Sequence, residues 1–413
     1  SEESDQETFL SDTDEDIPPN QAAGLGGDFV HRTQLPVPMP EPSGFSMWSI
    51  LTRNIGKDLS KISMPIIVHE PLSALQVLCE ELEYSYLLDT AVIEKDPVQR
   101  MILVAGFAVS CYASTFYRAE RKPFNPLLGE TFECVRDDKC FRFVAEQVCH
   151  HPPISACQAE GRDWVWWQDA RVRIKFWGKS MEIQPQGQVH LTLSPWSEEY
   201  VWNKVTTCVH NMLSGQRWVD QYGEMVVNCA QTGLRVRLVF EKAHRQATGL
   251  EVQGTVHSHE RPRQPLHRLV GKWNEGLYVD SELTGKCIWR AASMPPNHQL
   301  YYGFTHFAIQ LNQITPQAHK ILPPTDSRLR PDQRALEEGR VDEGDEMKDK
   351  LQEAQRERKR QREARNEQYQ PLWFQEVSDG KSGTAWRLKG QPEGDYWRAR
   401  ENRFSGLQFE PVW

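Results

Sequence analysis

The chain has 413 residues, 39% hydrophobic and 25% charged, which is the composition of a soluble globular protein with room for a sizeable core. Its formal net charge is -9, but residues 1–16 carry eight acids and no base, so the remainder is close to neutral. This balance argues against a nucleic-acid-binding protein, which would be strongly basic. The nine scattered cysteines show no Cys-x-x-Cys in their densest group, 134–157, and indicate reduced thiols in a cytoplasmic protein.

The first 44 residues predict a disordered arm. An acidic run is followed by a glycine-rich and then a proline-rich stretch, and such a segment cannot bury a core. Order is expected to begin near residue 45, where apolar residues recur at three- and four-residue steps on one helical stripe. These residues are Phe45, Trp48, Leu51 and Ile55. Two interpretations stay open: a helix packed on its own domain, or a mobile lid that touches membranes.

Two more helices are expected before the strands begin. One is predicted over about 71–89, and the other opens at Asp96 and Pro97, a cap residue followed by proline in the first turn. The second of these carries an uncharged run over 101–117. A bilayer span needs about 20 strongly apolar residues. The run has 17 residues and includes Gly106, Ser110, Ser114 and Thr115, so a buried core helix is favoured over a transmembrane segment.

From about residue 131 to 321 the hydrophobic period changes to two. Residues 171–176, 189–193 and 234–238 alternate strictly, and Gly and Pro interrupt the pattern at short intervals. Such a succession predicts an antiparallel sheet that curls or closes into a barrel. The interior of that barrel must be filled by side chains or by a ligand, and composition leaves both open.

The pattern returns to helix after residue 324, and a charge-dense stretch covers 345–368. Its basic cluster is either a solvated helix face or a contact for anionic membranes or phosphate. No cofactor or metal site is predicted. Residues 177–180 (Trp-Gly-Lys-Ser) resemble half a phosphate-binding loop, but Arg173 stands where its first glycine belongs. There is also no Gly-x-Ser-x-Gly and no His-Glu-x-x-His.

Two adjacent histidines, His150 and His151, precede two prolines. Neighbouring residues of a regular strand point to opposite faces, so the pair makes a poor metal chelate. The prolines end the strand ladder, which would allow both imidazoles to turn toward one anion such as phosphate. The anion would raise the histidine pKa values. Two ordinary histidines with satisfied hydrogen bonds are the alternative.

The histidine pair lies in a longer motif that resembles a known family. Residues 146–155 (Glu-Gln-Val-Cys-His-His-Pro-Pro-Ile-Ser) are similar to the fingerprint of the oxysterol-binding-protein-related lipid transfer family. Three further motifs agree in order: 122–131 (Lys-Pro-Phe-Asn-Pro-Leu-Leu-Gly-Glu-Thr), 176–180 (Phe-Trp-Gly-Lys-Ser) and 322–331 (Leu-Pro-Pro-Thr-Asp-Ser-Arg-Leu-Arg-Pro). The resemblance covers roughly residues 31–413. Residues 54–60 and 213–218 are similar to the subfamily whose full-length members also carry a pleckstrin-homology domain.

The resemblance implies an α+β fold that is mainly β. A near-complete antiparallel β-barrel would enclose a lipid tunnel, with an N-terminal lid and helices and a C-terminal helical segment. We therefore expect a lipid-binding domain over 45–413, divided into a lid and helices (45–120), a barrel (121–321) and a C-terminal subdomain (322–413). In the family the tunnel holds one sterol or phospholipid, and many members exchange it for phosphatidylinositol 4-phosphate.

The resemblance also implies the residues that hold the phosphoinositide headgroup. Matching the motifs position by position gives Lys122, Asn125, His150, His151, Lys348, Gln352 and Arg356. Positions 348, 352 and 356 follow at i, i+4 and i+8 on one helix, and a phosphomonoester needs several fixed cationic donors. This chain departs from the family at Gln352, usually Glu, and at Cys149, usually Ser. Weaker headgroup binding is expected from both changes.

The expected function is lipid binding and transfer between membranes, without enzymatic chemistry or a cofactor. The protein is expected to be cytoplasmic and peripheral to membranes, at the endoplasmic reticulum and its contact sites. Two rivals stay open: a lipid sensor or scaffold that moves little lipid, and an enzyme that uses the two histidines as acid and base on phosphoinositides. The tail between Thr8 and Asp14 loosely resembles a motif that binds an endoplasmic-reticulum receptor, with plain disorder as the alternative.

Overall fold

The computed structural model describes residues 30–41, 64–246, 248–378, 383–391 and 394–413. The contacts within the chain define two units, 1–30 and 31–413, and the second contains the fold. The predicted lid residues Phe45, Trp48, Leu51 and Ile55 lie outside the described residues, as does the tail between Thr8 and Asp14.

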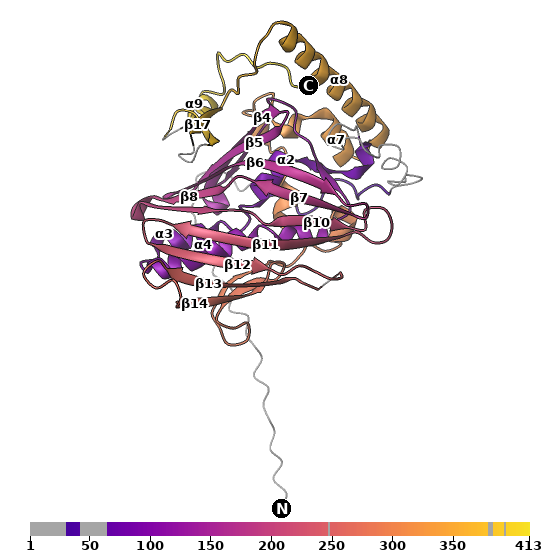
Figure 1. Ribbon diagram of the computed structural model, residues 1–413. Helices are drawn as coiled ribbons and strands as arrows, with labels where there is room; N and C mark the ends of the chain where they lie inside the picture. Colours follow the sequence, from indigo (N-terminus) through magenta and orange to yellow (C-terminus); the bar gives the residue numbers. More distant parts are fainter. Residues whose placement is uncertain (1–29, 42–63, 247, 379–382, 392–393) are drawn as a thin grey trace, which may run out of the picture. The chain divides into compact units, whose positions relative to one another are not determined.

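The fold is built on one 14-stranded sheet (Figure 1). Its main hydrogen-bonded path runs β16-β15-β14-β13-β12-β11-β10-β7-β6-β5-β4-β3, and β8 and β9 bridge β6 to β11 beside it. The strands are β3 (Thr131–Arg136), β4 (Phe141–His150), β5 (Pro153–Glu160), β6 (Trp164–Phe176), β7 (Ser180–Gln186), β8 (Val189–Leu193), β9 (Glu198–Trp202), β10 (Thr206–His210), β11 (Trp218–Cys229), β12 (Leu234–Phe240), β13 (Glu251–Ser258), β14 (His267–Lys272), β15 (Gly276–Val279) and β16 (Cys287–Arg290). The pairing is antiparallel throughout this sheet, so the prediction of a mainly β, antiparallel fold is confirmed.

Helices precede the sheet, with one difference from the prediction. The single helix expected over 71–89 is two helices, α2 (Ala74–Glu80) and α3 (Tyr86–Ile93), separated by a turn. Its expected start belongs to strand β1 (His69–Ser73), which pairs in parallel with β2 (Lys122–Phe124). Extended backbone is needed for that pairing. Helix α2 therefore begins only after Ser73, whose side chain closes a capping box with Gln76.

Helix α4 (Pro97–Ser110) lies against the inner side of the sheet. It starts as predicted, because the Asp96 carboxylate accepts a hydrogen bond from the Val98 N–H at 2.9 Å and Pro97 fills the first turn. Pro97–Tyr117 is apolar and long enough to cross a membrane by length and composition, but 67% of its most apolar window is buried in the protein. Its contacts with β12, β15 and β16 are those of a core helix, and Figure 1 shows α3 and α4 behind the central strands.

The C-terminal part adds α7 (Pro331–Glu337), α8 (Val341–Ala364), the β17–β18 hairpin (Phe374–Ser378 and Thr384–Leu388) and α9 (Asp395–Glu401). It shares an apolar core with β4 and β5. Glu146, the first residue of the fingerprint motif, joins the two parts: its buried carboxylate accepts hydrogen bonds from the backbone N–H groups of Leu372, Trp373 and Phe374. Burial raises the pKa of Glu146 to about 7.

Residues 322–331 form a buried ionic network. Arg330 donates to the carboxylates of Glu130 (3.0 Å) and Asp332 (2.8 Å) and to the Asn125 carbonyl oxygen (2.8 Å). These bonds fix the turn after β2 against α7, which places Lys122 and Asn125 beside the helical region. The nine cysteines are free thiols. The boundaries predicted at residues 120 and 321 stay predictions.

Candidate functional site

Four neighbouring strands of the sheet, β6, β7, β10 and β11, share one face that lies on the inner side of the sheet, the side that carries α4. On β6 and β7 this face is apolar. On β6 this face carries Val172, Ile174 and Phe176. Residues directly opposite each other in an antiparallel pair share a face. The register Ile174, Ile183, Thr207, Gln221 therefore carries the face across all four strands. The Gln221 side chain donates to Thr115 Oγ1 at 3.1 Å, in the turn after α4, so the face looks inward.

This face, here called the inner apolar wall (Val172, Ile174, Phe176, Met181 and Ile183), is only partly covered. Val172 is 47% exposed, Ile174 49% and Phe176 36%. Elsewhere the inner side of the sheet packs on α4 and the segment after it, as in the edge-to-face contacts of Phe107 with Trp202 and of Tyr112 with Phe240. Apolar surface left exposed to water is unfavourable by about 25 cal/mol per Å². The inner apolar wall is therefore suited to an apolar ligand.

A group of cationic side chains lies around β2. Lys122 is on β2, Lys348 is on α8 and only 3% exposed, and Arg330 precedes α7. Burial, together with the charges of Lys348 and Arg330, lowers the pKa of Lys122 to about 8. Burial likewise lowers the pKa of Lys348. We call Lys122, Lys348 and Arg330 the cationic cluster.

Two polar residues border the cationic cluster. The Lys122 ammonium lies 3.5 Å from the Asn125 side-chain oxygen and donates to the Pro123 carbonyl at 2.9 Å. His69 stacks on Phe124 with ring centroids 4.6 Å apart. Burial lowers the pKa of His69 well below its ordinary value, and Lys122, Lys348 and Arg330 add to the effect.

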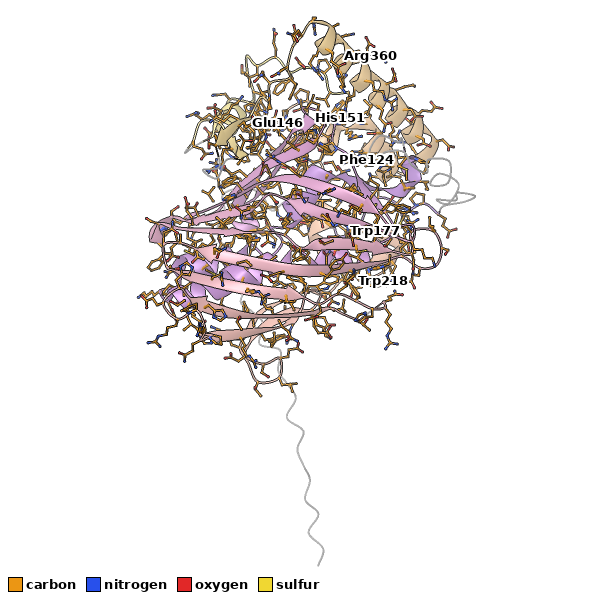
Figure 2. The ribbon with its side chains drawn as sticks, viewed as in Figure 1. Phe124, Glu146, His151, Trp177, Trp218 and Arg360 are labelled. Carbon is orange, nitrogen blue, oxygen red and sulfur yellow. The ribbon has the colours of Figure 1, made fainter. Side chains whose placement is uncertain are left out.

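The histidine pair lies at the turn between β4 and β5, where His150 pairs with Pro153. The two rings lie 4.4 Å apart between centroids, and Figure 2 shows His151 at the end of the hairpin nearest α8. The Nδ1 atom of His150 is buried and has no hydrogen-bond partner within the part of the chain that the structure describes. Burial lowers the pKa of His150 to about 4, assisted by His151 and by Lys359 of α8.

The three predicted headgroup residues of helix α8, at positions 348, 352 and 356, differ in their burial and in their contacts. Lys348 is buried beside Lys122, Gln352 is half-buried, and Arg356 is exposed and paired with Glu353 at 3.3 Å. The structure thus brings Lys122, Asn125 and Lys348 together in one group and His150 and His151 in another, with Lys359 beside the histidines. In the described residues Arg356 contacts its own helix instead of the histidines.

Comparison with known proteins identifies the family. The family model described as oxysterol-binding protein matches residues 46–401. The chain belongs to the oxysterol-binding protein family. It is 47% identical over 430 residues to the human oxysterol-binding protein-related protein 6, covering 100% of this chain and 45% of that protein. It is 51% identical over 350 residues to the human oxysterol-binding protein-related protein 3, covering 84% of this chain and 39% of that protein. The chain spans less than half the length of these relatives.

Solved structures of the family have the same fold. The ORD of Osh3 from Saccharomyces cerevisiae, in complex with PI(4)P, matches with a TM-score of 0.82 and 35% identity, covering 93% of this chain and 99% of that one. The Osh1 ORD domain in complex with cholesterol matches with a TM-score of 0.82 and 35% identity, covering 91% and 93%. The family and the fold expected from the four motifs are both confirmed.

Family motifs alone did not reveal Lys359 as a neighbour of the histidines, although the sequence contains the signal. At about 100° per residue, position 356 lies roughly 80° around the helix from position 348, whereas position 359 lies within about 20° of it. A period of 3.6 therefore favours Lys359 over Arg356 as the continuation of the Lys348 face. The exposure of the inner apolar wall was not detectable, because alternation over 171–176 is the same for a covered and an uncovered strand.

The low pKa of His150 predicts how stability depends on pH. A histidine whose folded-state pKa is below its ordinary value favours the unfolded state as it becomes protonated. The contribution of His150 to the free energy of unfolding should therefore be largest above about pH 6.5 and be lost as the pH drops toward 4. It is measured as the difference between wild type and a His150 variant, because Glu146, whose pKa is raised, changes stability in the opposite direction over this range. Urea unfolding at pH 7 and pH 5 measures this. The loss should be smaller in His150→Asn and unchanged in His259→Asn, which alters an exposed histidine of a distant turn. An equal loss in all three proteins would contradict the assignment.

Proposed function

We propose that this chain binds one lipid on the inner side of its antiparallel sheet and carries it between membranes. Phosphatidylinositol 4-phosphate would be exchanged for a sterol or another lipid. The observation that carries the proposal is the cationic cluster: Lys122 and Lys348 are held close together, with Arg330 beside them, and burial together with the repulsion between these charges lowers the pKa of Lys122. A multiply charged phosphate relieves that repulsion. The family relatives solved with PI(4)P and with cholesterol support both ligand classes.

The headgroup residues would bind different parts of the lipid headgroup, according to the chemistry of their side chains. Lys122 and Lys348 would bind the phosphate, His150 and His151 would donate to it after taking up a proton, and Asn125 and Gln352 would hydrogen-bond inositol hydroxyls. Arg356 would have to leave Glu353, a pair that is exposed and therefore weak. Lys359 would add charge beside the histidines.

The lipid tail would lie on the inner apolar wall, and the segment containing Phe45, Trp48, Leu51 and Ile55 would cover it as a lid. No covalent step is involved, so the chain would act as a carrier and not as an enzyme. We place it in the cytoplasm, peripheral to membranes and at contact sites of the endoplasmic reticulum. A receptor there would bind the tail between Thr8 and Asp14.

A charged side chain on the inner apolar wall should block the proposed transfer. Ile174→Lys would place an ammonium group against the lipid tail, and burying an unpaired charge is strongly unfavourable. Transfer of a fluorescent sterol and of phosphatidylinositol 4-phosphate from donor to acceptor liposomes should fall at least about tenfold. Ile93→Lys is the matched control, because Ile93 is 75% exposed on α3.

The outcomes separate the proposed function from its rival. A wild-type protein that binds both lipids but moves neither would be a sensor or scaffold. Equal transfer by wild type and Ile174→Lys would show that the tail does not lie on this wall.

A further inference from the structure

Trp177 is the most exposed aromatic side chain among the described residues, at 63%. It occupies the tight turn between β6 and β7, where the Lys179 N–H donates to its carbonyl oxygen at 2.9 Å. The pKa of the Glu182 carboxyl is lowered mainly by the Tyr222 hydroxyl and in part by the Trp177 indole N–H. The polar edge of the ring thus lies on the side of a carboxylate, while most of the side chain is exposed to solvent. A side chain with one polar and one apolar end is suited to the boundary between water and lipid.

The turn that carries Trp177 is joined to a second turn, between β10 and β11. The Met212 N–H donates to the Lys179 carbonyl oxygen at 2.9 Å, so the two turns lie side by side. Figure 2 shows Trp177 and Trp218, at the start of β11, at the same end of the sheet. We call this part of both turns the rim surface: Trp177 and Lys179, which are exposed, and Met212, Leu213 and Arg217, which are partly exposed.

The rim surface continues into the headgroup site. The Arg217 guanidinium donates to the Glu120 carbonyl oxygen at 2.9 Å, and Glu120 lies two residues before Lys122. The same turns end the strands that carry the inner apolar wall. A molecule leaving the wall past Lys122 would therefore pass beside the rim surface.

Charge on the rim surface is mainly positive. Lys179 and Arg217 belong to it, and Lys175 and Arg121 lie next to it. The acids nearby are Glu120 and Glu182, and the carboxylate of Glu182 already accepts hydrogen bonds from Tyr222 and Gln184. A positive rim around an exposed indole matches an anionic bilayer, which attracts each lysine or arginine near its surface.

We propose that the rim surface docks on an anionic lipid bilayer, with Trp177 inserted at the interface and Lys179 and Arg217 against the headgroups. The proposal rests on the proposed function in one respect: a carrier must meet the bilayer where its cargo leaves. Docking would bring Lys122 and the end of the inner apolar wall to the membrane surface, so that a lipid enters without crossing water.

The test is binding of the full chain to sedimented vesicles that contain no sterol or phosphoinositide. One set is phosphatidylcholine alone and the other also contains phosphatidylserine. Trp177→Ala should weaken binding to both sets by about tenfold. Lys179→Glu reverses a charge and should weaken binding to phosphatidylserine vesicles by about twentyfold, with little effect on phosphatidylcholine. Leu283→Ala is the matched control, because Leu283 is 95% exposed in the turn between β15 and β16.

Binding of a soluble short-chain phosphatidylinositol 4-phosphate distinguishes this inference from the proposed function. Both variants should bind it like wild type, which also shows that they are folded. If wild type does not bind it, the proposed function fails while the vesicle result still stands. The inference is overturned if wild type does not sediment with vesicles, or if Lys179→Glu and Trp177→Ala both sediment as wild type does. Loss in the Leu283 control would also overturn it.

Discussion

Lys122→Met should weaken binding of a phosphatidylinositol 4-phosphate headgroup by about 100-fold without destabilising the protein. A hydrogen bond to a charged group contributes about 1.5–3 kcal/mol, and this lysine is a half-buried donor of the cationic cluster. Methionine keeps the length and the apolar stem but removes a charge that Lys348 and Arg330 oppose. Binding is measured by titration calorimetry with a short-chain lipid, and stability by thermal unfolding.

Lys350→Met is the control for Lys122→Met, because it removes an exposed lysine from α8 only two residues from Lys348. It should leave both the affinity and the unfolding midpoint unchanged. Wild-type affinity should also decline as the pH rises through about 8, where Lys122 loses its proton. A Lys122→Met protein that binds the headgroup normally would remove this residue from the site.

Arg330→Ala should lower the free energy of unfolding by about 3–5 kcal/mol. Arg330 is 2% exposed, and its removal leaves the carboxylates of Glu130 and Asp332 buried without their cation. Breaking a buried ionic network by removing one partner has this effect, because the remaining charges are not solvated. Urea unfolding monitored by circular dichroism provides the measurement.

Arg340→Ala is the matched control for Arg330→Ala. Arg340 also pairs with two carboxylates, those of Glu338 and Glu343, but its side chain is 43% exposed. Water and salt replace such partners readily, so little change in stability is expected. Similar losses in the two variants would mean that burial of the Arg330 network is not what stabilises the turn after β2.

Sequence features that act within a few residues correctly predicted the start of α4 and two strands of the sheet. The start of α4 followed from Asp96 and Pro97, because a cap residue and a proline in the first turn act through bonds within a few residues. The strict alternation of 171–176 and 234–238 predicted two strands of the sheet in the same way. The late start of α2 was not predictable, because it depends on β1 pairing with β2, which is about 50 residues away.

The candidate site was predictable as a set of residue types but not as an arrangement. Motif matching named Lys122 and Lys348 together, and the structure brings them together. It also named Arg356, whose exposed pairing with Glu353 depends on helix geometry and on neighbouring side chains. The helical period of 3.6 contains the signal for Lys359, whereas the openness of the inner apolar wall arises from packing between distant segments. The headgroup assignments as a whole stay predictions.

Glu146 has a consequence for how this protein can be shortened. Its carboxylate, fully enclosed, depends on three amide groups supplied by residues 372–374. A truncated protein that ends before residue 372 would leave the Glu146 carboxylate buried without these hydrogen-bond donors. This would destabilise the β4–β5 hairpin, whose turn carries His150 and His151. The last forty residues therefore cannot be treated as an appendage: they are part of the folding unit that holds the pair in place.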